Sequence, residues 1–175
     1  MEKPLSAKIM IKAFQLLDRK LDRPLILIMG GGGAMILAHE FPLSTSDIDA
    51  IPKGLEQHEL SVYIEQIARE MNLPGDWLNP YFSTFSHTLP ADYQARLIRV
   101  FDGAKLKVDS LGREEMLIMK CFAHRSKDVG HAKQLLKLGV DIKLVERQME
   151  LLKKKSIPGV DEALEFLDDI LEQIG

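Results

Sequence analysis

The apolar residues of this chain recur with two periods, one typical of helices and one typical of strands. Spacings of three and four residues predict amphipathic helices over 4–22, 55–71, 113–125, 132–138, 142–154 and 160–174. Continuous or alternating apolar runs predict short strands over 25–29, 47–51, 96–101 and 106–108. The order strand, helix, strand, helix begins an α/β arrangement in which the first two strands lie side by side, and the chain after residue 129 is predicted to be helical throughout.

The stretch from Leu25 to Ile51 contains the strongest chemical signal in the chain. A short apolar strand runs into four consecutive glycines, residues 30–33, and then into a short apolar helix. A polar turn follows and leads into a second strand, whose alternation places Asp47 and Asp49 on one face. Two neighbouring carboxylates repel each other, and such a pair is tolerated when a divalent cation lies between them. The stretch therefore predicts a cation site.

Length and charge limit the classes of protein to consider. The chain has 175 residues, which suits one domain or one domain with a small helical appendix, and its 46% hydrophobic content supports a proper core. The net charge of −3 provides no basic field for non-specific binding of nucleic acid. Three consecutive lysines, Lys153 to Lys155, are interpreted as a solvated helix end rather than as a binding patch.

The cysteine and the ends of the chain bear on its compartment. The single cysteine, Cys121, excludes an internal disulfide framework and suits a reducing compartment. Because it lies within an apolar helical pattern, a packed thiol is expected rather than a nucleophile. No segment approaches the roughly eighteen apolar residues that a membrane span needs, and the first ten residues do not read as a signal peptide. We expect a cytoplasmic protein with no membrane partner.

The order strand, Gly-Gly turn, helix and Ser-Asp-x-Asp strand resembles the nucleotidyltransferase superfamily. The residues at 31–34 match the GGxA of its toxin–antitoxin branch, and those at 46–49 match its S-D-x-D. A tight turn and a solvated strand edge would each explain one half of the pattern, but the combination is more specific. The resemblance implies an α+β fold, with a small mixed sheet flanked by helices and a helical C-terminal portion. It also implies a nucleotidyltransferase-like domain over 1–138, with 139–175 as a helical extension packed on it.

The resemblance assigns roles to the residues of this stretch. Asp47 and Asp49 would hold Mg²⁺, as one ion or two, and would act as catalytic carboxylates. Backbone N–H groups at Gly31 and Gly32 would face the phosphates of a nucleoside triphosphate, helped by the positive end of the following helix. The hydroxyl of Ser46 could donate to the same phosphates. We therefore expect a nucleoside triphosphate as substrate.

A second block resembles the AbiEii-type nucleotidyltransferases. It reads K-x-x-x-x-R-x-K-D from Lys120 to Asp128, and in that family the helix lysine and the aspartate reach the active site. The family commonly has an acidic residue where this chain has His131, so the match departs there. The alternatives are a snorkelling surface lysine for Lys120 and a helix N-cap for Asp128.

A loop with two prolines, residues 73–80, holds the only tryptophan. The run from Trp77 to Asn79, WLN, resembles an uncharacterised branch of the same superfamily. Trp77 and Asn79 are therefore candidates for lining the substrate cleft. The alternative for Trp77 is a plug that fixes the loop onto the core, and the residues themselves do not decide between the two.

Two features expected of an active enzyme are missing from the pattern. The third carboxylate of the superfamily is not identified, although Asp102, Asp109 and Asp128 are candidates, and Leu43 and Ser44 occupy the region of a basic residue. Two hypotheses follow. The first is an enzyme that transfers a nucleoside monophosphate to a protein or RNA hydroxyl, with a cognate toxin or antitoxin as a conceivable partner. The second is a non-catalytic nucleotide-binding or partner-binding domain on the same fold.

Overall fold

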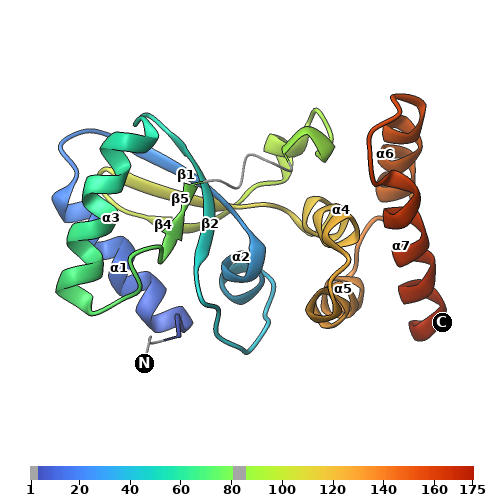
Figure 1. Ribbon diagram of the computed structural model, residues 1–175, viewed down its shortest axis with the longest axis horizontal. Helices are drawn as coiled ribbons and strands as arrows, with labels where there is room; N and C mark the ends of the chain where they lie inside the picture. Colours follow the sequence, from blue (N-terminus) through green and yellow to red (C-terminus); the bar gives the residue numbers. More distant parts are fainter. Residues whose placement is uncertain (1–3, 81–85) are drawn as a thin grey trace. The chain divides into compact units, whose positions relative to one another are not determined.

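The computed structural model describes residues 4–80 and 86–175, and it confirms the α+β class (Figure 1). The described chain divides into two compact units. The first, here called the sheet unit, contains residues 4–80 and 97–111, and the second, the helical unit, contains residues 86–96 and 112–175. The segment 81–89, expected to be a short helix or an edge segment, lies partly outside the described residues.

The sheet unit is built on a mixed sheet of five strands in the order β3-β2-β1-β5-β4. The strands are β1 (Leu25–Gly30), β2 (Ile48–Lys53), β3 (Leu78–Asn79), β4 (Ile98–Asp102) and β5 (Leu106–Ser110). The central strand β1 pairs antiparallel with β2 and parallel with β5, while β3 extends β2 in parallel. The neighbouring first two strands are confirmed. The Asp-Gly pair at 102–103 suggests a hairpin between the next two strands, and β4 does pair antiparallel with β5.

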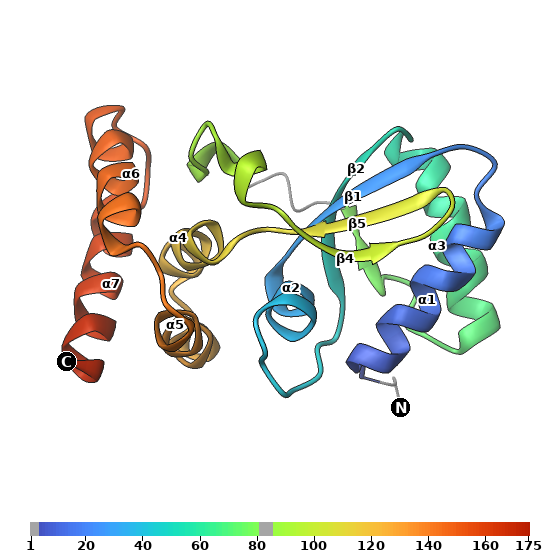
Figure 2. The same cartoon turned by 180° about the vertical axis from the view of Figure 1, so that it is seen from behind.

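Helices α1 (Ala7–Lys20) and α3 (Gln57–Met71) lie side by side against one face of this sheet (Figure 1 and Figure 2). The alternation of β1 directs Leu25, Leu27 and Met29 into this core, where all three are fully buried, whereas Ile26 is 38% exposed. The rings of Phe14 and Phe101 contact each other in the same layer, with centroids 5.7 Å apart. The opposite face of the sheet therefore carries the even-numbered positions of β1 and their cross-strand neighbours.

Several element boundaries differ from the sequence prediction, among them the start of α5 at Ser126 rather than at residue 132 and three boundaries near the predicted motif. Helix α2 (Gly31–Ala38) begins at the glycines themselves rather than at Ala34, and β2 begins one residue after Asp47. From the sequence, Ser110 is a candidate N-cap for the helix that follows, but it is the last residue of β5, and Gly112 is the N-cap of α4. Because β5 extends to Ser110, its hydroxyl donates to the carbonyl of Leu111 instead.

The helical unit contains α4 (Arg113–Ala123), α5 (Ser126–Leu138), α6 (Ile142–Lys154) and α7 (Val160–Ile174). Each contributes an apolar stripe to a core that includes Leu117, Leu135, Met149 and Leu167, all fully or almost fully buried. Since α4 and α5 pack with α6 and α7, this compact unit begins before residue 138. A separate extension over 139–175 stays a prediction. No helix in the described part of the chain has both the length and the apolar character that crossing a membrane requires.

Candidate functional site

The candidate site lies where β1 ends, α2 begins and β2 starts. Gly30 is the cross-strand partner of Asp49, so the first residue of α2 lies beside the carboxylate of Asp49. Gly31 has a φ of +62°, and a Cβ added there would overlap Asp49 Oδ2. Glycine is required at 31 for two reasons, the left-handed backbone and the contact with a carboxylate. The N-terminus of α2 and Asp49 therefore form one site.

The next glycine is confined by the loop that precedes β2. A Cβ added to Gly32 would lie 2.8 Å from Thr45 Oγ1, and the Thr45 hydroxyl donates to the carbonyl of Asp47 at 3.1 Å. The sequence suggested that Gly32 lacks a side chain so that a phosphate can approach. The structure adds a reason within the protein, because Thr45 already fills that space.

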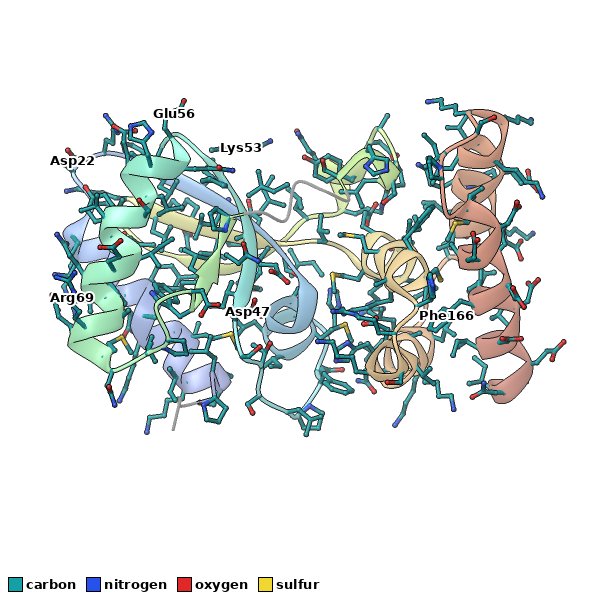
Figure 3. The ribbon with its side chains drawn as sticks, viewed as in Figure 1. Asp22, Asp47, Lys53, Glu56, Arg69 and Phe166 are labelled. Carbon is teal, nitrogen blue, oxygen red and sulfur yellow. The ribbon has the colours of Figure 1, made fainter. Side chains whose placement is uncertain are left out.

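The two aspartates of the motif differ in their surroundings. Asp49, on β2, accepts a hydrogen bond at its Oδ1 from Asn79 Nδ2 at 3.1 Å. Asp47 precedes the strand, as Figure 3 shows, and the hydroxyl of Ser46 lies 3.5 Å from its Oδ1. Both carboxylates are partly exposed, so both can be reached from solvent.

A third carboxylate shares the sheet face with Asp49. Asp49 is opposite Gly30 and Asp109 is opposite Ile28, and alternate residues of β1 point to the same side. Asp109 is ion-paired with Arg99 on β4, and Arg99 Nη2 lies 3.3 Å from Asp109 Oδ2. Asp109 is a candidate from the sequence, but its partner Arg99 is apparent only from the register of the hairpin, in which the two residues are opposite each other.

The donor set at this site fits a divalent cation of the hard class. Mg²⁺ takes oxygen ligands and is usually held by one or two carboxylates together with substrate phosphates. Asp47 and Asp49 would supply the carboxylates, and the N-terminus of α2 beside Asp49 would favour phosphate. Among the residues described, no group of three or more acidic, histidine or cysteine side chains gathers for a metal.

Trp77 is fully buried, and its indole Nε1 donates to the carbonyl of Ile64 on α3 at 3.0 Å. This is the plug arrangement, in which the tryptophan fixes the loop to the core. Asn79, two residues later, emerges on β3 beside Asp49. Trp77 and Asn79 were both expected to line a cleft, but Trp77 is a buried anchor, whereas the amide-bearing Asn79 is partly exposed.

Lys120 and Asp128 lie together in the helical unit, where the side chains are 4% and 0% exposed and Lys120 Nζ donates to Asp128 Oδ1 at 3.1 Å. Lys120 is therefore not a surface lysine. Asp128 is the third residue of α5, not its N-cap, and it also accepts from Arg125 Nε at 2.8 Å. His131 Nδ1 lies 3.8 Å from the same carboxylate.

Charge and burial oppose each other at this pair. Burial would raise the pKa of Asp128, but the nearby ring of His131, the hydrogen bonds from Arg125 and the charge of Lys120 outweigh it and hold that pKa well below its ordinary value. Burial lowers the pKa of Lys120, although the charge of Asp128 opposes the change. Next to Lys120, burial raises the pKa of the Cys121 thiol to about 12, which excludes a reactive thiolate.

The chain was compared with known families, proteins and structures. A family model described as "Nucleotidyltransferase of unknown function (DUF6036)" matches residues 7–164, nearly the whole chain. Neither the comparison with curated proteins nor that with solved structures gave a match. The match spans the glycine turn, Asp47 and Asp49, and helices α4 to α6. The chain therefore belongs to this family of nucleotidyltransferases.

Proposed function

We propose that this protein is a Mg²⁺-dependent enzyme that moves a nucleoside monophosphate from a nucleoside triphosphate to a hydroxyl of a protein or an RNA. The observation that carries the proposal is the contact between the carboxylate of Asp49 and the backbone of Gly31 at the start of α2. It brings a cation ligand and a phosphate-binding helix end to the same point. Asp47, at the entrance to the same strand, supplies the second carboxylate.

Nucleotidyl transfer is an in-line displacement at the α-phosphorus, and its charge develops on phosphate oxygens. A bound Mg²⁺ supplies positive charge beside those oxygens and brings the acceptor hydroxyl and the phosphate together. The residues of this chain bind the triphosphate and orient it. Backbone N–H groups at Gly31 and Gly32 donate to phosphate oxygens, and the hydroxyl of Ser46 is a further donor. Lys120 and Asp128 have no assigned step, because they already satisfy each other.

The acceptor is proposed from the motif rather than from the site geometry. The GGxA turn and the block from Lys120 to Asp128 resemble relatives in toxin–antitoxin and phage-defence systems. This supports an acceptor that is a protein or an RNA of the same cell, such as a cognate toxin or antitoxin.

A non-catalytic nucleotide-binding module is the second candidate. It is favoured by Asp109, whose carboxylate is engaged by Arg99 and so is not available to complete a set of three with Asp47 and Asp49. Such a module would bind Mg²⁺ and triphosphate at the same place without transferring anything.

The first experiment tests the site. Thermal unfolding is measured with Mg²⁺ and each of the four nucleoside triphosphates, for wild type and for a variant with Asp47→Asn and Asp49→Asn. A ligand that binds only the native state raises its melting temperature, so wild type should gain stability and the variant should not. Equal gains in both proteins would refute the site. Gly32→Val is a poor substitute, since its side chain would collide with Thr45.

The second experiment separates enzyme from module. Protein is incubated with each α-labelled triphosphate, Mg²⁺ or Mn²⁺, and extract containing the native proteins and RNAs. Label transferred to a macromolecule by wild type, and absent with Asp47→Asn, supports the enzyme. Tight binding of a triphosphate without any labelled product favours the module.

A further inference from the structure

We infer that Asn79 is a positioning residue, whose side-chain amide holds the carboxylate of Asp49 in the orientation that binds the divalent cation. The inference rests on the proposed function and deepens it. It gives Asn79 a different role from the substrate contact that the sequence suggested.

The first argument is the hydrogen bond itself. Strand β3 pairs with β2 in parallel, and Asp49 lies next to Asn79 in this register. The side chains of Asp49 and Asn79 therefore project from the same face of the sheet. Asn79 Nδ2 donates to Asp49 Oδ1 at 3.1 Å. An ionised carboxylate can only accept hydrogen bonds, so the NH₂ end of the amide must face it.

The carboxylate is then fixed at both of its oxygens. Oδ1 is held by Asn79, while Oδ2 lies against the backbone of Gly31. Rotation of the carboxylate about its terminal bond out of this plane would weaken the hydrogen bond from Asn79. A carboxylate oxygen has more than one lone pair, so the same oxygen can accept a hydrogen bond and ligate a cation.

The strand that carries Asn79 is short but firmly anchored. β3 has two residues, and the residue before it, Trp77, is fully buried. The indole of Trp77 donates to the carbonyl of Ile64 at 3.0 Å, and the Trp77 carbonyl accepts from the backbone N–H of Ile48 at 2.7 Å. The amide of Asn79 is therefore presented from a rigid support, as a residue that orients a metal ligand requires.

The choice of an amide matters because it is neutral. On the same sheet face, Asp109 is paired with the guanidinium of Arg99, whose positive charge opposes the binding of a cation. Asn79 orients Asp49 without cancelling its charge. Asp109 therefore has a charged partner, Arg99, whereas Asp49, which belongs to the predicted motif, has a neutral partner, Asn79.

The competing interpretation is direct contact between Asn79 and substrate. Asn79 lines a surface groove with Pro80, Ser61 and other residues of α3, so a ligand in that groove could reach it. The two roles differ in what they predict without nucleotide. If Asn79 positions Asp49, replacing Asn79 weakens the binding of a cation in the absence of nucleotide. If Asn79 contacts only the substrate, its replacement leaves that cation affinity unchanged.

The experiment titrates Mn²⁺ alone into the full-length protein and follows free Mn²⁺ by electron paramagnetic resonance. Removal of a residue that orients a metal ligand typically costs roughly 10–100-fold in affinity, and this loss is expected for Asn79→Leu, which is similar in volume but lacks the donor. Asn79→Gln, which keeps the amide, should recover part of the loss. The matched control is Gln57→Ala, which removes a nearby amide bonded to the Pro80 carbonyl but not to Asp49.

Asp49→Asn reports whether the bound Mn²⁺ is at this site. Wild-type affinity in Asn79→Leu, together with loss of binding in Asp49→Asn, would overturn the positioning role and leave the proposed function intact. Absence of Mn²⁺ binding by wild type would overturn the positioning role, whereas the proposed function would still be decided by thermal unfolding with Mg²⁺ and triphosphate together. If Asn79→Leu does not fold, as judged by circular dichroism, Asn79→Ala takes its place, and the same affinities decide.

Discussion

At the scale of single residues, adding one methyl group at Gly31 is the most direct test of the contact between α2 and Asp49. Its left-handed backbone and its contact with Asp49 make any side chain unfavourable. We predict that Gly31→Ala destabilises the fold by about 1–3 kcal/mol, the usual cost of a strained backbone, and displaces the Asp49 carboxylate. Urea unfolding and Mn²⁺ titration measure the two effects.

The matched control for this change is Gly75→Ala. A Cβ added at 75 meets nothing within 4 Å, and the backbone there is not left-handed. Gly75→Ala should therefore keep wild-type stability and wild-type cation binding. If Gly31→Ala behaved in the same way, Gly31 would be an ordinary turn residue and the contact with Asp49 would have no consequence.

At the scale of elements, the ion pair of Lys120 and Asp128 joins α4 to α5. Lys120→Met should destabilise the protein, because it leaves a buried carboxylate without its buried cation. We expect the low end of the roughly 3–5 kcal/mol that such losses cost, since Arg125 and His131 still face Asp128. Chemical denaturation measures the change in the free energy of unfolding. The control is Lys127→Met at an exposed lysine in the first turn of α5, which should have almost no effect on that free energy.

The result distinguishes two roles for Lys120. A structural lysine lowers stability when it is replaced, and activity falls only as far as the fold does. If Lys120→Met kept full stability and yet abolished label transfer, the lysine would have to reach the reacting phosphates in some other arrangement of the helical unit.

A second contact between elements predicts a pH dependence. Asp18, near the end of α1, accepts hydrogen bonds from the backbone N–H groups of Ala104, Lys105 and Leu106 in the turn between β4 and β5. The bonds from Leu106 and Lys105 are the main cause that lowers the pKa of Asp18 below 3.8. A lowered native pKa means that this stabilisation is present above pH 3.8 and is lost as the pH falls further.

We predict that Asp18→Asn costs about 1 kcal/mol at neutral pH, a small value because the site is half exposed. The cost should shrink as the pH falls below about 3.8, where wild type also loses the charge. Urea unfolding across pH 3 to 7 checks this. The same substitution at Asp22, whose partner is the hydroxyl of Tyr63, is the control. A cost independent of pH would mean that the ionised form contributes nothing.

At the scale of the whole molecule, the two compact units have separate cores. Leu17 of α1 and Leu167 of α7 are both almost completely buried, one in each unit. Replacing either by alanine should cost about 2–5 kcal/mol. We predict that Leu167→Ala accelerates hydrogen exchange chiefly in α4 to α7, and that Leu17→Ala accelerates it chiefly in β1, β2 and α3. Uniform acceleration along the chain in both variants would show that the protein unfolds as one cooperative unit.

The sequence by itself determined the features that depend on near neighbours. Apolar periodicity placed α1, α3, α6 and α7 and the central strands, because the spacing of side chains along an element decides which face is buried. The motif around Gly31 and Asp49 was recognisable for the same reason, since its parts follow one another along the chain. The resemblance to nucleotidyltransferases followed from that order of residues, and the family match confirms it, although the match does not show the toxin–antitoxin branch.

Only the tertiary structure decided which distant groups meet. Asn79 is thirty residues from Asp49, and their contact depends on a strand of two residues that no local pattern indicates. Arg99 was hidden as the partner of Asp109, because its position depends on the register of a hairpin with an irregularity. Lys120 gives no sign in the sequence of being buried, since its burial results from helices packing around it. Strand register and helix packing depend on contacts between segments that are distant in the sequence. Local residue patterns predict each helix or strand but not these contacts.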